Sequence, residues 1–205
     1  MSTKPIASND ILTVPNVISG LRLVVSAAVF VLLAWQWWGW GLAAFVLAAS
    51  TDAVDGWYAR RYNAVSVLGR ILDPLVDKVL ICGTYVMLAA TPAAAGQPVS
   101  IVGWMAVVVV VRELVVTGVR GEMERQGIDF SAGFSGKLKM ILQSIAIPAD
   151  LIVRGDLAAG LGEPARGMLP TVALVTAWLA ILLTIWSGVE YLWAARGVLT
   201  GSHRR

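Results

Sequence analysis

Long apolar segments separated by short links dominate this chain of 205 residues. Six segments are 16 to 25 residues long, and a helix needs about 20 apolar residues to cross the hydrocarbon core of a bilayer. Charged residues make up only 14% of the sequence, against about 25% in soluble domains. We therefore expect an all-α, polytopic membrane protein with six transmembrane helices in a single catalytic domain, residues 1–205. After a polar N-terminal segment, 1–14, the expected spans are 15–35, 41–62, 69–91, 99–119, 137–152 and 169–193.

The basic residues indicate the orientation of the helices, because cytoplasmic links of membrane proteins carry an excess of Lys and Arg. With both termini on one side, 14 of the 16 basic residues lie on that side or in the adjoining helix ends, and only Arg154 and Arg166 lie on the other. We expect a multi-pass protein of the cell inner (cytoplasmic) membrane with both termini cytoplasmic. The bilayer is its expected surroundings, and no nucleic-acid partner is expected.

The helices also become polar at a similar depth. Counted from their outer ends, the first five spans stay apolar for 11 to 15 residues, or about 17–22 Å, in a hydrocarbon core about 30 Å thick. This agreement predicts a polar cavity, and an active site, open to the cytoplasm. The alternative is that each charged side chain reaches the interface individually, which suits Lys and Arg better than the short Asp side chain.

Four aspartates stand in this polar zone. Asp52 and Asp55 are three residues apart, so they share one face of a helix. Asp73 and Asp77 are four residues apart and also share a face. The polar link 62–66 favours a turn that sets the two helices antiparallel. Crowded carboxylates repel each other, and hard divalent cations such as Mg²⁺ or Mn²⁺ relieve that repulsion.

The spacing of these residues resembles the signature of the CDP-alcohol phosphatidyltransferases, Asp-x2-Asp-Gly-x2-Ala-Arg-x8-Gly-x3-Asp-x3-Asp. All eight specified positions match, at Asp52, Asp55, Gly56, Ala59, Arg60, Gly69, Asp73 and Asp77. In that family a CDP-linked lipid donates its phosphatidyl group to an alcohol and CMP is released. The resemblance implies two divalent cations, Mg²⁺ or Mn²⁺, held by the four aspartates. It also implies that Asp77 is the general base for the acceptor hydroxyl.

Further matched positions are expected to bind CDP-diacylglycerol. Small residues at Gly56 and Ala59 let a ligand approach the second span closely, although helix packing is an alternative role for them. In the family, positions matching Gly56, Arg60 and Ser66 hold the CDP moiety. The expected contacts are Asn16, Gly56, Ala59, Arg60, Ser66 and Gly69.

A cluster of basic residues suggests the acceptor, because a phosphorylated acceptor needs several cationic donors. The expected phosphate-binding residues are Arg112, Arg120, Lys137 and Lys139, and we expect Glu113 to pair with one of them. Pro15-Asn16 and Arg112-Glu113 also resemble elements of the bacterial CDP-diacylglycerol–glycerol-3-phosphate 3-phosphatidyltransferases. That resemblance implies CDP-diacylglycerol and sn-glycerol 3-phosphate as the substrates. The products would be phosphatidylglycerophosphate and CMP, in a step of phospholipid biosynthesis. It also implies a homodimer.

Other functions remain open from the residues alone. Phosphatidylinositol-phosphate synthases also take a phosphorylated acceptor, and cardiolipin synthases of the CDP-alcohol type share the signature. From another class, an aspartate cluster suits the cation site of a membrane transporter. A transporter needs access from both faces, however, and the outer parts of these helices are expected to offer no titratable pathway.

Overall fold

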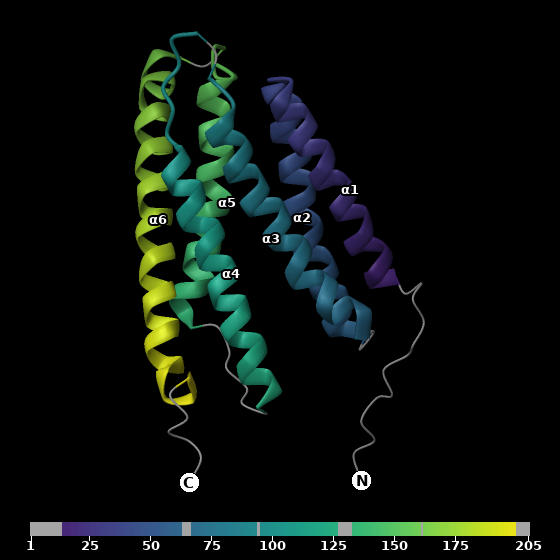
Figure 1. Cartoon of the computed structure of the whole chain (residues 1–205). Coiled ribbons are helices and arrows are strands. Elements are labelled where there is room, and N and C mark those ends of the chain that lie inside the picture. Colours follow the sequence, from purple (N-terminus) through teal and green to yellow (C-terminus); the bar gives the residue numbers. More distant parts are fainter. Residues whose placement is uncertain (1–13, 63–66, 94, 127–132, 161, 200–205) are drawn as a thin grey trace.

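The computed structural model describes residues 14–62, 67–93, 95–126, 133–160 and 162–199. Within the helices, the side chains of residues 14–19, 52–62, 67–74, 77, 165 and 197–199 are not described. Six helices and no strands occur in the described residues, which confirms the predicted all-α class (Figure 1). The helices are α1 Val14–Ala34, α2 Trp38–Tyr62, α3 Val67–Ala90, α4 Gly103–Arg125, α5 Phe134–Arg154 and α6 Glu163–Leu199.

Successive helices run in opposite directions, so that α1 begins and α6 ends at the same end of the bundle (Figure 1). Helix α1 packs against α2 and α3, while α6 packs against α4 and α5. Contacts of α3 with α4 and α5, and of α2 with α5, join the two groups. In Figure 1 the two groups diverge toward the lower end, where α2 ends, α3 begins, α4 ends and α5 begins. The aspartate motif and the basic cluster therefore belong to the same end of the molecule.

Several helices differ in length from the expected spans. Helix α4 begins four residues later than predicted, at Gly103, and continues to Arg125, through residues expected to form a link. Helix α5 is continuous through Pro148, and α6 extends six residues beyond the predicted span at each end. Hydropathy marks only the apolar part of a helix, whereas its terminal turns often continue into polar residues.

A buried ion pair explains the late start of α4. Asp150 and Arg154, one turn apart on α5, are fully buried, and Arg154 Nε donates a hydrogen bond to Asp150 Oδ2. Asp150 Oδ1 accepts hydrogen bonds from the backbone N–H groups of Ser100 and Ile101, at 2.9 and 3.3 Å. Arg154 also donates to the backbone carbonyls of Thr91 and Ile101. Since buried backbone groups need partners, these side chains hold the segment between α3 and α4 outside the helix.

Asp150 also corrects an expectation about the outer half of the bundle. The expectation that the outer part of the fifth span is apolar is wrong, because Asp150 lies within it. Its carboxylate is balanced by Arg154 and by two backbone donors. The spacing of four residues between an Asp and an Arg on one helix was the available signal for this pair.

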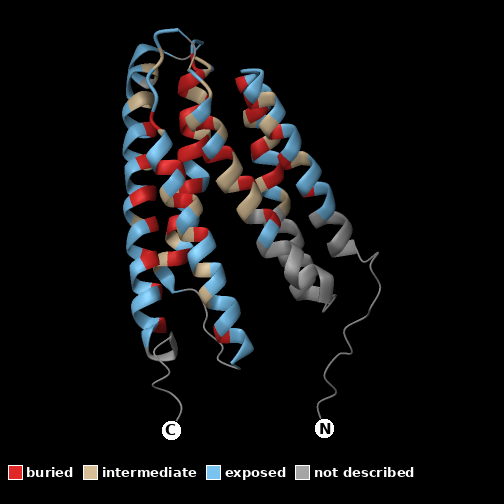
Figure 2. Cartoon of the chain, viewed as in Figure 1, coloured by how far each residue is buried: buried red, intermediate tan, exposed pale blue. Residues whose placement is uncertain are grey.

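Many large apolar side chains are exposed, while several polar and charged ones are buried. Figure 2 shows exposed residues along the outside of the bundle and buried residues mainly between the helices. Trp40, Leu114 and Trp186 are each more than 60% exposed, whereas Lys139 and Gln143 are 3% and 1% exposed. Large exposed apolar patches are rare on soluble monomers, and helices packed in a membrane use polar residues as interhelical contacts. The distribution therefore favours a lipid environment.

One helical stretch of the described residues, Arg166–Arg196 in α6, is long and apolar enough to cross a membrane by its length and composition. Three shorter apolar stretches occur at Gly20–Ala34, Trp38–Thr51 and Lys78–Ala90. The six-span topology accordingly remains a prediction.

Breaking the buried pair is expected to destabilise the fold. Arg154→Ala leaves the Asp150 carboxylate buried without its cation, at a cost of about 3–5 kcal/mol. Arg166→Ala is a matched control, because its pair with Asp156 is partly exposed and such pairs contribute about 0–1 kcal/mol. Thermal unfolding in detergent should show a large fall in the midpoint for Arg154→Ala alone. Equal midpoints for the two variants would contradict a stabilising role of the pair.

Candidate active site

The four motif aspartates lie on the two helices that are joined by residues 63–66. Asp52 and Asp55 lie ten and seven residues before the end of α2. Asp73 and Asp77 lie six and ten residues after the start of α3. Because the two helices are antiparallel (Figure 1), these positions fall at similar levels, about 9–15 Å from the joined helix ends. The side chains of all four aspartates lie outside the described part.

Five of the six residues expected to bind CDP-diacylglycerol lie in α1, α2 and α3. Asn16 lies in the first turn of α1, and Gly69 in the first turn of α3. Gly56, Ala59 and Arg60 lie between Asp55 and the end of α2. Ser66 lies outside the described residues, as do the side chains of the others. The five residues in the helices lie toward the end of the bundle that holds the aspartates.

A polar cluster between α4, α5 and α6 has its side chains described. Glu113 of α4 is its centre, because Glu113 Oε1 accepts hydrogen bonds from Arg112 Nη1, at 3.0 Å, and from Lys139 Nζ of α5. Arg112 Nη2 donates to Ser187 Oγ of α6 at 3.2 Å. One carboxylate and one guanidinium thus connect three helices. The expected pairing of Glu113 with a basic residue is confirmed.

This cluster carries more positive than negative charge. The Lys139 side chain is 3% exposed, and those of Arg112 and Glu113 are each 12% exposed. Two cations share one carboxylate, so these three side chains have a formal net charge of +1 (two positive, one negative). Excess charge away from water is costly unless it is paired. The cluster is therefore suited to binding an anion.

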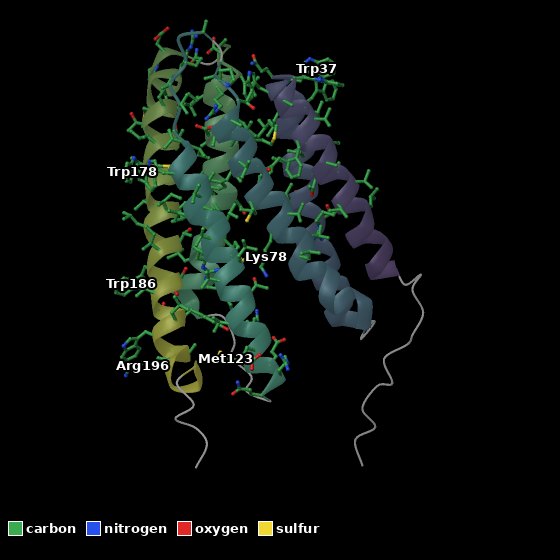
Figure 3. The ribbon with its side chains drawn as sticks, in the orientation of Figure 1. Trp37, Lys78, Met123, Trp178, Trp186 and Arg196 are labelled. Atoms are coloured by element: carbon green, nitrogen blue, oxygen red, sulfur yellow. The ribbon has the colours of Figure 1, made fainter. Side chains whose placement is uncertain are left out.

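The aspartate-bearing helix α3 borders this cluster. Lys78 follows Asp77 directly in α3 and lies close enough to Lys139 to interact with it electrostatically, as does Cys82 one turn further on. Figure 3 shows the Lys78 side chain extending from α3 toward α4. The segment of α3 that follows Asp77 therefore lies within electrostatic range of Lys139.

The structure separates the four basic residues expected to bind the acceptor phosphate. Arg112 and Lys139 meet at the shared carboxylate. Arg120 lies two turns further along α4, is half exposed and pairs with Glu124 at 3.2 Å. Lys137 is exposed, because residues two apart on a helix point about 200° from each other and Lys139 faces inward. Arg112 and Lys139 are thus the two that the fold brings together.

Three further polar residues of the network were not expected from the sequence. Gln143, one turn after Lys139 on α5, donates to Thr184 Oγ1 of α6 at 2.9 Å, and Ser187 contacts Arg112. They stand in largely apolar stretches of α5 and α6. The available signal was their spacing, since residues three or four apart on a helix share a face.

The donor set that can hold a metal consists of the aspartates of α2 and α3. Elsewhere in the described part, no three His, Cys, Asp or Glu side chains come together. Carboxylate oxygens alone suit a hard divalent cation rather than a softer transition metal. The chemistry of the four residues therefore fits Mg²⁺ or Mn²⁺.

Comparison with known families decides the class of this protein. The sequence pattern of the CDP-alcohol phosphatidyltransferase family matches residues 12–189, a range that includes the aspartate motif and the cation cluster. The chain belongs to the CDP-alcohol phosphatidyltransferase family. It is therefore an enzyme of this class, and the family generally uses divalent metals.

Relatives of this phosphatidyltransferase carry consistent names. A CDP-diacylglycerol–glycerol-3-phosphate 3-phosphatidyltransferase of Bacillus subtilis (strain 168) is 34% identical over 151 residues, covering 74% of this chain and 70% of the relative. A probable phosphatidylglycerophosphate synthase of Mycobacterium tuberculosis (strain H37Rv) is 33% identical over 186 residues, covering 86% and 78%. A CDP-diacylglycerol–glycerol-3-phosphate 3-phosphatidyltransferase of Rickettsia typhi is 30% identical over 156 residues, covering 76% and 80%.

Proposed function

We propose that this protein transfers the phosphatidyl group of CDP-diacylglycerol to sn-glycerol 3-phosphate, giving phosphatidylglycerophosphate and CMP. Family membership supports the reaction type, and the names of the relatives support both substrates. The buried cation cluster of Arg112 and Lys139 is the structural observation that carries the choice of acceptor. An acceptor with a phosphate group needs such a site, whereas an uncharged alcohol does not.

The four motif aspartates are proposed to hold two divalent cations, Mg²⁺ or Mn²⁺. When bound, the cations polarise the phosphoryl oxygens of the CDP-linked lipid and stabilise the displacement. Asp77 accepts the proton of the acceptor hydroxyl as the acceptor oxygen bonds to phosphorus and CMP leaves. The matching signature and the similar levels of the four positions on α2 and α3 support this assignment.

The donor is proposed to bind where α1 begins, α2 ends and α3 begins. Gly56 and Ala59 leave room for its approach to α2, while Arg60 supplies a cation for its diphosphate. The proposed contacts are Asn16, Gly56, Ala59, Arg60, Ser66 and Gly69.

The acceptor phosphate is proposed to bind Arg112 and Lys139. A guanidinium can bind two phosphate oxygens with parallel N–H bonds, and a lysine adds a point charge. Arg120 and Lys137, which are exposed at the same end of the bundle, raise the local concentration of the anionic acceptor. The reacting hydroxyl then lies toward α3, which adjoins the cluster at Lys78.

We further propose that all six helices span the cytoplasmic membrane, with both termini and the active site on the cytoplasmic side. The exposed apolar surface and the distribution of basic residues support this topology. Helix α6, with 37 residues, is about 55 Å long, so its ends extend beyond a hydrocarbon core of about 30 Å. The homodimer suggested by the family resemblance stays a prediction.

The first test is an acceptor panel with the purified protein in detergent, CDP-diacylglycerol and Mg²⁺. We expect CMP release with glycerol 3-phosphate, little with free glycerol, and none after chelation of the metal. Faster release with myo-inositol 3-phosphate than with glycerol 3-phosphate would leave the family assignment intact and refute the proposed acceptor. Absence of CMP release with every acceptor would contradict the proposed reaction.

A second test concerns the proposed base. Asp77→Asn should lower turnover by about 10²–10⁴-fold, because a positioned proton acceptor is lost. Binding of CDP-diacylglycerol, followed by thermal shift, should persist. Asp156→Asn is the control, since Asp156 lies after α5 at the other end of the bundle and pairs with Arg166. Full recovery of turnover by excess metal would show that Asp77 acts only as a ligand.

A third test compares the contributions of the basic residues to binding of the acceptor. Arg112→Ala should raise the KM for glycerol 3-phosphate by about ten- to hundredfold, because a charge-assisted hydrogen bond contributes about 1.5–3 kcal/mol. The KM for CDP-diacylglycerol should change little. Arg120→Ala should have a smaller effect, and Arg125→Ala, whose side chain is 82% exposed, should have none. An unchanged acceptor KM in Arg112→Ala would show that the phosphate site is misplaced.

A further inference from the structure

Two neighbouring residues of helix α6, Ser187 and Gly188, contact the side chain of Arg112, which belongs to helix α4. Arg112 Nη2 donates to Ser187 Oγ at 3.2 Å, and the Ser187 hydroxyl lies 3.2 Å from the backbone carbonyl of Thr184. A Cβ atom placed on Gly188 would lie 3.2 Å from Arg112 Cγ, closer than an ordinary carbon–carbon contact. The aliphatic part of Arg112 therefore packs on the bare backbone of Gly188, and its guanidinium is directed by Ser187.

Part of this guanidinium is buried without a partner. Arg112 Nη1 bonds to Glu113 and Nη2 to Ser187, while Nε is buried and makes no hydrogen bond within the described part of the chain. A buried donor left unpaired costs about 1–3 kcal/mol, and such groups in native structures require an explanation. A bound anion provides one, because the cluster around Arg112 also holds the Lys139 ammonium.

We propose that Ser187 and Gly188 are positioning residues that orient Arg112 toward the phosphate of the acceptor. The inference rests on the proposed function, in which Arg112 binds that phosphate. A planar guanidinium binds two phosphate oxygens only when its plane has the correct direction, and small errors in position weaken recognition strongly. The inference assigns this contact to the acceptor phosphate, because Arg112 is the residue that Ser187 and Gly188 contact.

The same helix offers matched controls for a purely structural role. The Thr176 hydroxyl bonds to backbone carbonyls of α6 itself, at Val172 and Ala173. Gly167 has open space where a Cβ atom would lie. Thr176→Ala and Gly167→Ala therefore reproduce the loss of a hydroxyl and the addition of a methyl group in α6 at a distance from Arg112.

The kinetic test compares the full-length wild type, Ser187→Ala, Gly188→Ala and the two controls. We expect the KM for glycerol 3-phosphate to rise about tenfold in Ser187→Ala, as for a hydrogen bond to a charged group, and to rise in Gly188→Ala. The KM for CDP-diacylglycerol and the unfolding midpoint should match those of the controls. Ser187→Thr, which keeps the hydroxyl, should stay near the wild type. An unchanged acceptor KM, or an equal rise in both KM values, overturns the inference.

A binding measurement distinguishes this inference from the proposed function. Inorganic phosphate is titrated calorimetrically into the wild type and the variants without CDP-diacylglycerol. Weaker binding in Ser187→Ala and Gly188→Ala than in the controls supports the inference even when the natural acceptor is another phosphorylated alcohol. If glycerol 3-phosphate supports CMP release but all variants bind inorganic phosphate equally, the proposed function stands and the inference fails.

Discussion

Charged side chains inside an apolar helix bundle need partners, and this requirement organises both ends of the molecule. At one end, Asp150 and Arg154 neutralise each other and bind the backbone of the segment before α4. At the other, Glu113 gathers Arg112 and Lys139 from two helices. In a lipid environment, helices gain little free energy by burying apolar surface against one another. Polar contacts between helices then determine much of the specificity of their packing.

The two networks differ in how completely their charges are satisfied. Asp150 and Arg154 carry opposite charges, and each also bonds to backbone groups, so that pair serves the fold. The side chains of Arg112, Glu113 and Lys139 have a formal net charge of +1, and Arg112 Nε has no partner in the described part of the chain. A candidate binding site differs from a structural ion pair in that some of its charges and hydrogen-bond donors have no partner within the protein.

The arrangement of the helices then relates this site to the aspartate motif. A link of four residues keeps the end of α2 beside the start of α3, which sets the motif positions at similar levels. Lys78, directly after Asp77, lies within electrostatic reach of Lys139 on α5. A phosphorylated acceptor held by the cation cluster would thus lie beside the helix that carries the proposed base. This proximity makes one site for both substrates physically reasonable.

The sequence by itself determined the six helices, their antiparallel order and the motif residues, because hydropathy and spacing are local properties. It also indicated the contact of Glu113 with a basic residue, since Arg112 is its neighbour. Only the tertiary structure decided where α4 begins, because Ser100 bonds to a carboxylate 50 residues away. It likewise decided which basic residues meet and that Ser187 accepts a hydrogen bond from Arg112, 75 residues distant. Such contacts depend on how whole helices pack against one another, and the local sequence around each residue does not determine that packing.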